Sequence, residues 1–124
     1  MRALVLKQGK ILIVSVQSSQ TDAELGELRD ELVRKTGDVR ARGVVVDLTA
    51  LDVMDSFAVR TLTALAHMVK LRGADTVLVG IQPEVAFSMV QLGLGLEGVE
   101  VALDLEQGLE ILGRIEQERV RRGR

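Results

Sequence analysis

The stretch that most constrains the fold runs from Val44 to Ala58. It begins with the segment Val44-Val45-Val46-Asp47-Leu48, which shows no polar alternation along its length. A strand of this kind is covered on both faces, as in a parallel sheet. An acidic connector follows it, and the next helix is predicted to begin near Ser56. A buried strand that leads into a helix through a short connector is typical of α/β domains.

The rest of the chain continues this alternation. Apolar periodicity, capping residues and glycine stops predict elements in the order β-β-α-β-α-β-α-β-α. The first two strands form a hairpin, and the later strands are parallel and joined by right-handed crossovers. We therefore predict one α/β domain over residues 1–118, with a mixed, mostly parallel sheet and helices, followed by a basic, flexible tail at 119–124. The strands are expected at 3–6, 11–16, 44–48, 76–79 and 99–102, and the helices are expected to begin near 21, 56, 83 and 104.

Two helix starts carry the pattern of a capping box. Thr21 is followed by Glu24 at the third position, and Asp104 is followed by Gln107 at the same spacing. In each pair, the side chain of either residue is predicted to accept a hydrogen bond from the backbone amide of the other. In the last helix, the apolar side chains are predicted to face inward; they are Leu105, Leu109, Leu112 and Ile115.

The composition excludes several classes of function. The chain has 124 residues and no cysteine, which removes disulfides, thiolate nucleophiles and thiolate metal sites. A formal net charge of −2 argues against nucleic-acid binding by the domain as a whole. No segment approaches the roughly 20 apolar residues that a membrane span needs. We expect a cytoplasmic protein with no cofactor, no nucleic acid and no membrane segment.

The sequence offers little for catalysis. His67 is the only histidine, and it follows Ser56 by eleven residues on the same predicted helix, or about 16 Å along the axis. A nucleophile and its base lie within hydrogen-bond reach, so this pair is no dyad. Asp47, Asp52 and Asp55 cluster in sequence, and a solvated acidic loop is favoured over a cation site. We expect no enzyme and no metal, with a small α/β enzyme or nucleotide-binding domain as a remaining alternative.

Two further motifs carry weaker signals. The segment Gly93-Leu94-Gly95 lacks the third glycine of a dinucleotide motif and does not follow a strand, so a turn is favoured over a phosphate cradle. The basic residues 119–124 offer a contact for an acidic partner, but a solvated end is favoured.

Ser56 carries most of the functional argument. Serine is a preferred N-cap residue, so a purely structural role is one interpretation. The other is a regulatory phosphate, because a phosphate at a helix N-terminus meets free amides and the positive end of the helix dipole. A new dianion beside Asp52 and Asp55 would disturb folding little but would weaken any interface that desolvates the site. We therefore predict phosphorylation of Ser56.

Several segments resemble a known family. The strand, connector and helix with Val45-Val46-Asp47-Leu48-Thr49 and Met54-Asp55-Ser56-Phe57 resemble the STAS domain, named for sulphate transporters and anti-sigma factor antagonists. Within that family, the chain is most similar to the small single-domain scaffold of the bacterial stressosome, the RsbS type. The segments that carry this narrower likeness are 13–17, 79–83 and 102–109, together with Asp55-Ser56-Phe57. The likeness covers nearly the whole chain, apart from the tail at 119–124.

The resemblance implies a non-enzymatic scaffold in a large cytoplasmic particle. Such a scaffold assembles with larger STAS-bearing sensor proteins of the RsbR type and sequesters a switch serine kinase of the RsbT type. Under stress the kinase phosphorylates the STAS serine, which maps onto Ser56, and leaves the particle. A serine phosphatase resets the system. The alternative is a simple anti-sigma factor antagonist that binds an anti-sigma kinase directly and forms no large particle.

The contact surface is predicted to surround the serine. We expect self-association as a dimer or larger species, through the connector and the exposed flank of the second helix. Met54 and Val59 flank the serine without an obvious core role, so both are expected at this surface. The residues predicted to contact the kinase or the assembly are Asp52, Met54, Asp55, Phe57 and Val59.

Overall fold

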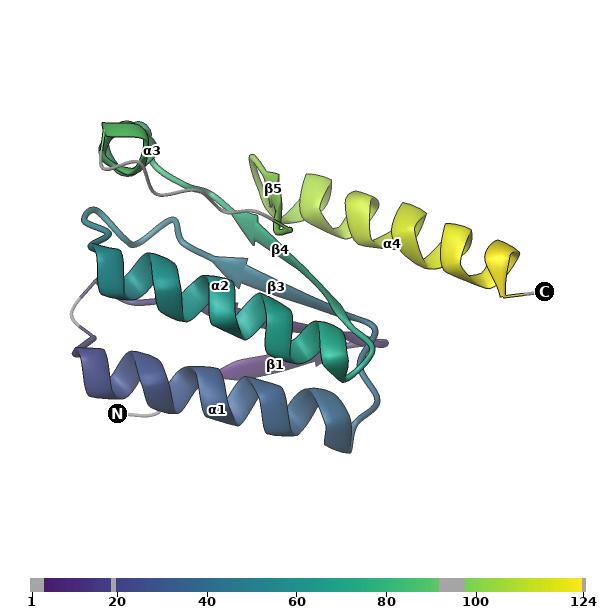
Figure 1. The fold of residues 1–124 in the computed structure, drawn as a ribbon. Helices are drawn as coiled ribbons and strands as arrows, with labels where there is room; N and C mark the ends of the chain where they lie inside the picture. Colours follow the sequence, from purple (N-terminus) through teal and green to yellow (C-terminus); the bar gives the residue numbers. More distant parts are fainter. Residues whose placement is uncertain (1–3, 19, 92–97, 124) are drawn as a thin grey trace.

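The computed structural model describes residues 4–18, 20–91 and 98–123, and they form a five-stranded sheet with four helices (Figure 1). The strands lie side by side in chain order; β1 is antiparallel to β2, and all other neighbours are parallel. The predicted order of elements and the mixed, mostly parallel sheet are confirmed. The strands are β1 (Val5–Gln8), β2 (Ile11–Ser15), β3 (Gly43–Asp47), β4 (Asp75–Val79) and β5 (Glu100–Ala102), and the helices are α1 (Asp22–Asp38), α2 (Ser56–Leu71), α3 (Pro83–Gln91) and α4 (Leu105–Arg122).

Two helices, α1 and α2, cover one face of the sheet (Figure 1). Successive right-handed crossovers that step across the sheet in one direction place their helices on the same side. The strands contribute side chains from alternate positions to the core under these helices, as expected for strands covered on both faces. Its fully buried members include Leu12, Val14, Leu32, Val44, Val46, Leu62, Leu65, Val69 and Leu78.

The other face carries α4, which packs on β4, β3 and β5. A smaller apolar cluster fills this layer and contains Val45, Val77, Val79, Ala102 and Leu112. Close approach of α4 depends on a glycine, because a Cβ atom on Gly108 would lie 2.8 Å from Cγ1 of Val79. The backbone of α4 at Gly108 therefore packs directly against the side chain of Val79.

The C-terminal boundary differs from the prediction. The expected flexible tail begins at residue 119, but α4 continues to Arg122. Arg119 bonds back to the domain: its guanidinium donates to the carbonyl of Gly73 at 3.1 Å and pairs with Asp75 and Glu116. Basic residues in the last turn are also favoured by the helix dipole. These interactions hold the helix past the predicted boundary.

The capping predictions are confirmed in one case and modified in the other. Thr21 accepts a hydrogen bond from the Glu24 amide, and Glu24 accepts one from the Thr21 amide. The bond from the Thr21 amide holds the pKa of Glu24 below its usual range. Asp104 caps α4 through the Gln107 amide, but the Gln107 side chain accepts from Leu103 rather than from Asp104.

Other details of the prediction differ at the ends of elements. Leu105 was expected to face inward and is 39% exposed, because the first turn of α4 precedes the Gly108 contact with the end of β4 and extends beyond the sheet. The hairpin is confirmed, with β1 placed at Val5–Gln8 rather than at 3–6. The predicted turn at 93–95 lies outside the described residues.

Candidate functional site

The connector between β3 and α2 is held by polar contacts at its start. The Asp47 carboxylate accepts from the Thr49 amide at 2.9 Å and from the Thr49 hydroxyl at 2.6 Å. The Gln82 side chain, just before α3, donates to the Thr49 carbonyl at 2.6 Å. Gly80 has a φ of +74° and lies so close that a Cβ atom would be 2.2 Å from the Thr49 hydroxyl oxygen. The start of the connector is therefore fixed against the loop after β4.

Two apolar side chains anchor the rest of the connector. Leu51 is 8% exposed and Met54 is 3% exposed, and both belong to the core beneath α1, α2 and α3. The expectation that Met54 lies at the contact surface is wrong, because α3 lies over this end of the core and contributes Val85 and Met89 to it. The residues that the connector exposes are Thr49, Ala50, Asp52, Val53 and Asp55.

Asp55 is the N-cap of α2. Its side chain accepts a hydrogen bond from the Ala58 amide at 2.8 Å, and its backbone is extended. Ser56 is the first helical residue and is exposed. Among the described residues, the Ser56 hydroxyl has no hydrogen-bond partner. The interpretation of Ser56 as the N-cap is therefore wrong, while its predicted place at the start of the helix is confirmed.

The side chains of the first turn of α2 differ in how deeply they are buried. Val59 is 3% exposed and belongs to the core, so the prediction that it lies at the contact surface is wrong. Phe57 is half-buried against the same core. The spacing of Val59, Leu62, Ala66 and Val69 is three, four and three residues, which is the stripe of an amphipathic helix. That periodicity was the available signal for the burial of Val59.

A hollow of about 170 Å³ lies beside the connector. It is formed by the loop before α1, the first turn of α1, the connector and the first two turns of α2. Its most buried apolar members are Leu62, Val16 and Leu25, whereas Gln17, Ser18 and Asp55 are exposed and polar. Exposed Val53, at 72%, also lines it and was not singled out from the sequence. An apolar centre with polar surroundings can receive a side chain from a partner protein.

The charges around Ser56 are of both signs. Asp52 and Asp55 are exposed carboxylates on its N-terminal side. Arg60 is exposed and follows Ser56 by four residues, the spacing at which side chains on one helix meet. The first-turn amides add the positive end of the helix dipole. A phosphate on Ser56 thus has both favourable partners on its own helix and repulsive neighbours in the connector.

The other candidate residues form no chemical site. His67 is exposed on α2, three turns from Ser56. Within residues 4–18, 20–91 and 98–123, no group of three histidine, aspartate or glutamate side chains is arranged to hold a metal ion. Asp47, Asp52 and Asp55 therefore do not form such a group. None of the helices in these ranges combines the length and apolar content needed to cross a bilayer.

This arrangement of strands, connector and exposed serine has a family match. The model of the STAS domain matches residues 2–107. The chain belongs to the STAS domain family. Two solved structures extend the likeness over almost the whole domain. A serine-to-glutamate variant of Moorella thermoacetica RsbS is 32% identical with a TM-score of 0.81, and the alignment covers 94% of this chain and 99% of that one.

The second structure comes from work on the molecular architecture of the stressosome, described as a signal integration and transduction hub. It is also 32% identical, with a TM-score of 0.75, and the alignment covers 91% of this chain and 98% of that one. The predicted likeness to small stressosome STAS proteins is thereby confirmed.

A curated relative is larger than this chain. RsbT co-antagonist protein RsbRA of Bacillus subtilis (strain 168) is 32% identical over 71 residues, which are 57% of this chain and 26% of that protein. The chain therefore matches about a quarter of RsbRA.

Proposed function

We propose that this STAS domain is a non-enzymatic, cytoplasmic scaffold of the stressosome type that sequesters a switch serine kinase. Phosphorylation of Ser56 releases the kinase, and a serine phosphatase restores the unmodified state. The scaffold assembles with larger sensor proteins of the RsbR type. The observation that carries the proposal is the exposed, unbonded hydroxyl of Ser56 at the start of α2, in a chain that aligns with RsbS over nearly its full length.

Ser56 suits a modification that leaves the fold intact. Its side chain has no capping role, so a phosphate displaces no hydrogen bond of the helix. The phosphate brings a charge of about −1.5 to −2 and strong acceptor oxygens to the positive end of α2. Arg60 is placed to neutralise part of this charge. The folded domain can therefore exist in both states, which a switch requires.

The kinase contact is proposed to surround Ser56 and the adjacent hollow. Asp52 and Asp55 supply charge, and half-buried Phe57 supplies an apolar edge. Val53 adds an exposed apolar side chain beside the hollow. Met54 and Val59 support this surface from beneath and do not form it. A phosphate here would need to be desolvated within the contact and would face Asp52 and Asp55, so modification weakens binding.

Kinase capture and phosphate transfer test this proposal together. A switch kinase of the RsbT type is mixed with the purified chain, with and without ATP and magnesium, and the mixture is separated by size-exclusion chromatography. Unmodified protein should co-elute with the kinase, and protein phosphorylated at Ser56 should not. Ser56→Ala should retain the kinase under both conditions, while Ser56→Asp should weaken retention only partly because it carries a single charge and fewer acceptors.

Ser88→Ala is the matched control. Ser88 is also exposed on a helix, but its hydroxyl donates to the Glu84 carbonyl at 3.0 Å. This variant should accept phosphate and release the kinase as the unaltered chain does. Phosphate recovered mainly at Ser15, Ser18 or Ser88, or full retention of the kinase by phosphorylated protein, would contradict the proposal.

Assembly with a sensor separates the scaffold from a simple anti-sigma factor antagonist. The scaffold should form a large particle with an RsbR-type protein, detectable by sedimentation velocity. A chain that binds its kinase and releases it on phosphorylation, yet forms no such particle, is the simpler antagonist.

A further inference from the structure

A hollow of about 530 Å³ lies beside the first residues of β4. The pairing of β4 with β5 begins at Val77 and Glu100. In the part of the chain that the structure describes, Asp75 and Thr76 therefore have no strand beside them on the β5 side. Figure 1 shows β4 extending past the short β5. The hollow lies at the notch that the late start of β5 leaves, between α2 and α4.

Thr76 directs polar groups into this notch. Side chains alternate along β4, and Leu78 belongs to the core under α2, so Thr76 faces the α2 side as well. Thr76 is 5% exposed and lines the hollow, and among the described residues its hydroxyl has no hydrogen-bond partner. Buried polar groups nearly always have a partner. The Thr76 hydroxyl is therefore available to a ligand in the hollow.

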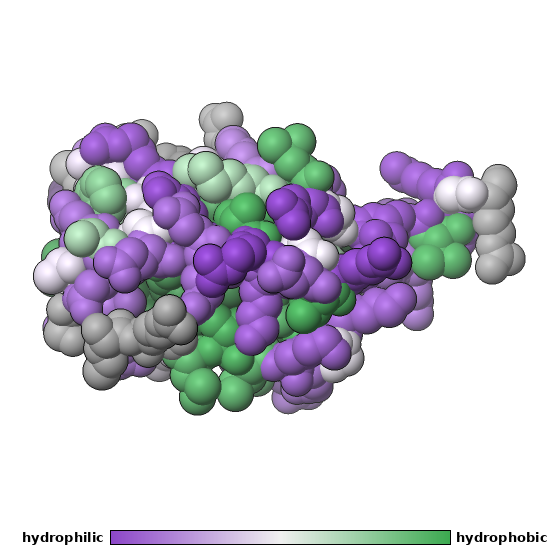
Figure 2. Space-filling model, turned by 90° about the horizontal axis from the view of Figure 1, so that it is seen from below, coloured by the Kyte–Doolittle hydropathy of each residue, from purple (hydrophilic) through white to green (hydrophobic). Residues whose placement is uncertain are grey.

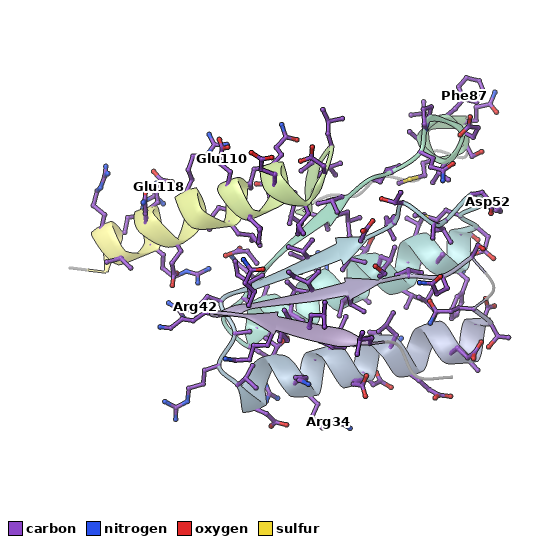
Figure 3. All side chains as sticks on the ribbon, turned by 180° about the vertical axis from the view of Figure 1, so that it is seen from behind. Arg34, Arg42, Asp52, Phe87, Glu110 and Glu118 are labelled. Carbon is purple, nitrogen blue, oxygen red and sulfur yellow. The ribbon has the colours of Figure 1, made fainter. Side chains whose placement is uncertain are left out.

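The backbone of Thr76 adds a second donor. The preceding amide, that of Asp75, donates to the Arg42 carbonyl at 3.1 Å, at the end of the sheet where Figure 3 shows Arg42. Successive amides of a strand point to opposite edges, so the Thr76 amide points away from β3 and toward the notch. A hydroxyl and an amide of one residue thus face the same space, which suits a group with two acceptor oxygens.

One ammonium group stands beside these donors. Lys70 lines the hollow, and its Nζ donates to Asp75 at 2.5 Å, which leaves two of its three N–H groups for other partners. Asp75 also pairs with Arg119, so its charge is balanced without Lys70. Glu100 is an exposed carboxylate that also lines the hollow and would repel a dianion. The charges therefore favour a carboxylate, with one negative charge, over a phosphate.

The remaining walls are largely apolar. They are formed by Ala66 of α2, by Val99 just before β5 and by Ile115 of α4. Seen from below, the last turns of α4 project beyond the rest of the domain, so the wall comes from the part of the helix before them (Figure 2). The His67 ring lies over Gly98, where an added Cβ would be 3.7 Å from Nε2. Apolar walls with a few convergent polar groups, in a volume of roughly 300–1,000 Å³, are typical of small-molecule sites.

We propose that this hollow binds a small apolar molecule that carries one carboxylate. The carboxylate accepts hydrogen bonds from the hydroxyl and amide of Thr76 and pairs with Lys70, and the apolar part lies against Ala66 and Val99. The site is separate from the proposed switch, because Ser56 lies about 21 Å away along α2.

Fluorine NMR of 4-(trifluoromethyl)benzoate mixed with the purified chain tests the site. We expect the resonance to broaden on addition of protein, with a dissociation constant of about 1 mM, as suits a ligand of this size. The matched neutral probe is 4-(trifluoromethyl)benzamide, which has the same shape without the charge and should bind at least about tenfold more weakly. In amide spectra of the labelled chain, the carboxylate should shift Ala66, Thr76 and Val99 and leave Ser56 in place.

Two variants remove the proposed ligand contacts one at a time. Thr76→Val keeps the shape of the side chain without the hydroxyl, and Lys70→Gln removes the charge; each should weaken binding at least about fivefold. Thr36→Val is the control for the first, because Thr36 is buried in α1 and its hydroxyl donates to the Leu32 carbonyl at 2.6 Å. Lys10→Gln, at an exposed lysine between β1 and β2, is the control for the second. Both controls should bind within about twofold of the unaltered chain.

Competition identifies the source of the carboxylate. Displacement of the probe by acetylated dileucine at a lower concentration than by 4-methylpentanoate would assign the site to the carboxyl end of a protein chain, and the reverse order to a free acid. No binding at about 5 mM probe, equal binding of the benzamide, or full binding by Thr76→Val would overturn the proposal and leave the Thr76 hydroxyl to a water molecule. Kinase capture by Thr76→Val should be unchanged, so failure here leaves the switch proposal standing.

Discussion

The Asp55 carboxylate accepts a hydrogen bond from the Ala58 amide at 2.8 Å, which assigns the cap of α2 to Asp55 and leaves the neighbouring Ser56 hydroxyl unbonded. Loss of an N-cap side chain costs about 1 kcal/mol, within a range of roughly 0.5–2. Asp55→Ala should lower the free energy of unfolding by this amount. Ser56→Ala should change it by less than about 0.5 kcal/mol, as a surface substitution does. Urea denaturation followed by circular dichroism measures both.

Asp55→Asn separates the cap from the charge. Asparagine is an equally good N-cap, so this variant should keep most of the stability that Asp55→Ala loses. If Ser56→Ala proved as destabilising as Asp55→Ala, the assignment of the cap to Asp55 would be wrong.

The second prediction contrasts two valines close to Ser56. Val53 is 72% exposed beside the hollow, and Val59 is 3% exposed in the core. Val53→Glu should keep a native circular dichroism spectrum and weaken kinase capture at least tenfold, because it places a charge in the proposed contact. Val59→Glu should unfold the domain or cost several kcal/mol, because it buries an unpaired charge.

Native folding of Val59→Glu together with lost kinase capture would restore the surface role that the sequence predicted for Val59. Full kinase capture by Val53→Glu would remove the hollow from the proposed contact.

The elements of the fold follow from local signals that the sequence displays. Thr21 and Glu24 stand at box spacing, and the reciprocal hydrogen bonds are present. The aliphatic segment before Asp47 forms the central strand β3, covered on both faces. Such features depend on residues that are close in sequence, so periodicity and capping rules can predict them.

Which residues of the candidate site are buried depends on tertiary contacts, and local sequence patterns do not specify these contacts. Met54 is buried because Val85 and Met89 of α3 complete the core around it, and nothing in the connector indicates this packing. Val59 differs, because its spacing to Leu62 and Val69 already indicated the buried stripe. Arg119 is bound to the domain through Asp75, which lies 44 positions earlier in the chain. Local sequence patterns therefore could not predict this contact either.

The third prediction concerns this long-range contact. Asp75 is 14% exposed and pairs with both Arg119 and Lys70, while Arg119 also reaches the Gly73 carbonyl. Arg119→Ala should lower the free energy of unfolding by about 1–2 kcal/mol, between the values for exposed and buried pairs. Arg121→Ala is the control: Arg121 is exposed two residues further along α4 and should change stability by less than about 0.5 kcal/mol.

Removal of residues 119–124 should destabilise the domain at least as much as Arg119→Ala. Equal stability of the shortened and the full chain would support the original boundary at residue 118.

The last prediction uses two glycines of α4. Gly113 has no atom within 4 Å of an added Cβ, so Gly113→Ala should stabilise the domain by up to about 1 kcal/mol through helix propensity. The same substitution at Gly108 would bring its Cβ to 2.8 Å from Val79 and 3.3 Å from Val77. Both are β-branched side chains of the buried sheet and have little freedom to move. Overpacking of this kind costs about 1–3 kcal/mol, which outweighs the gain in propensity. Gly108→Ala should therefore be less stable than the unaltered chain and Gly113→Ala more stable, in urea denaturation at low protein concentration. Equal shifts of the two variants would mean that α4 can move away from β4 at little cost.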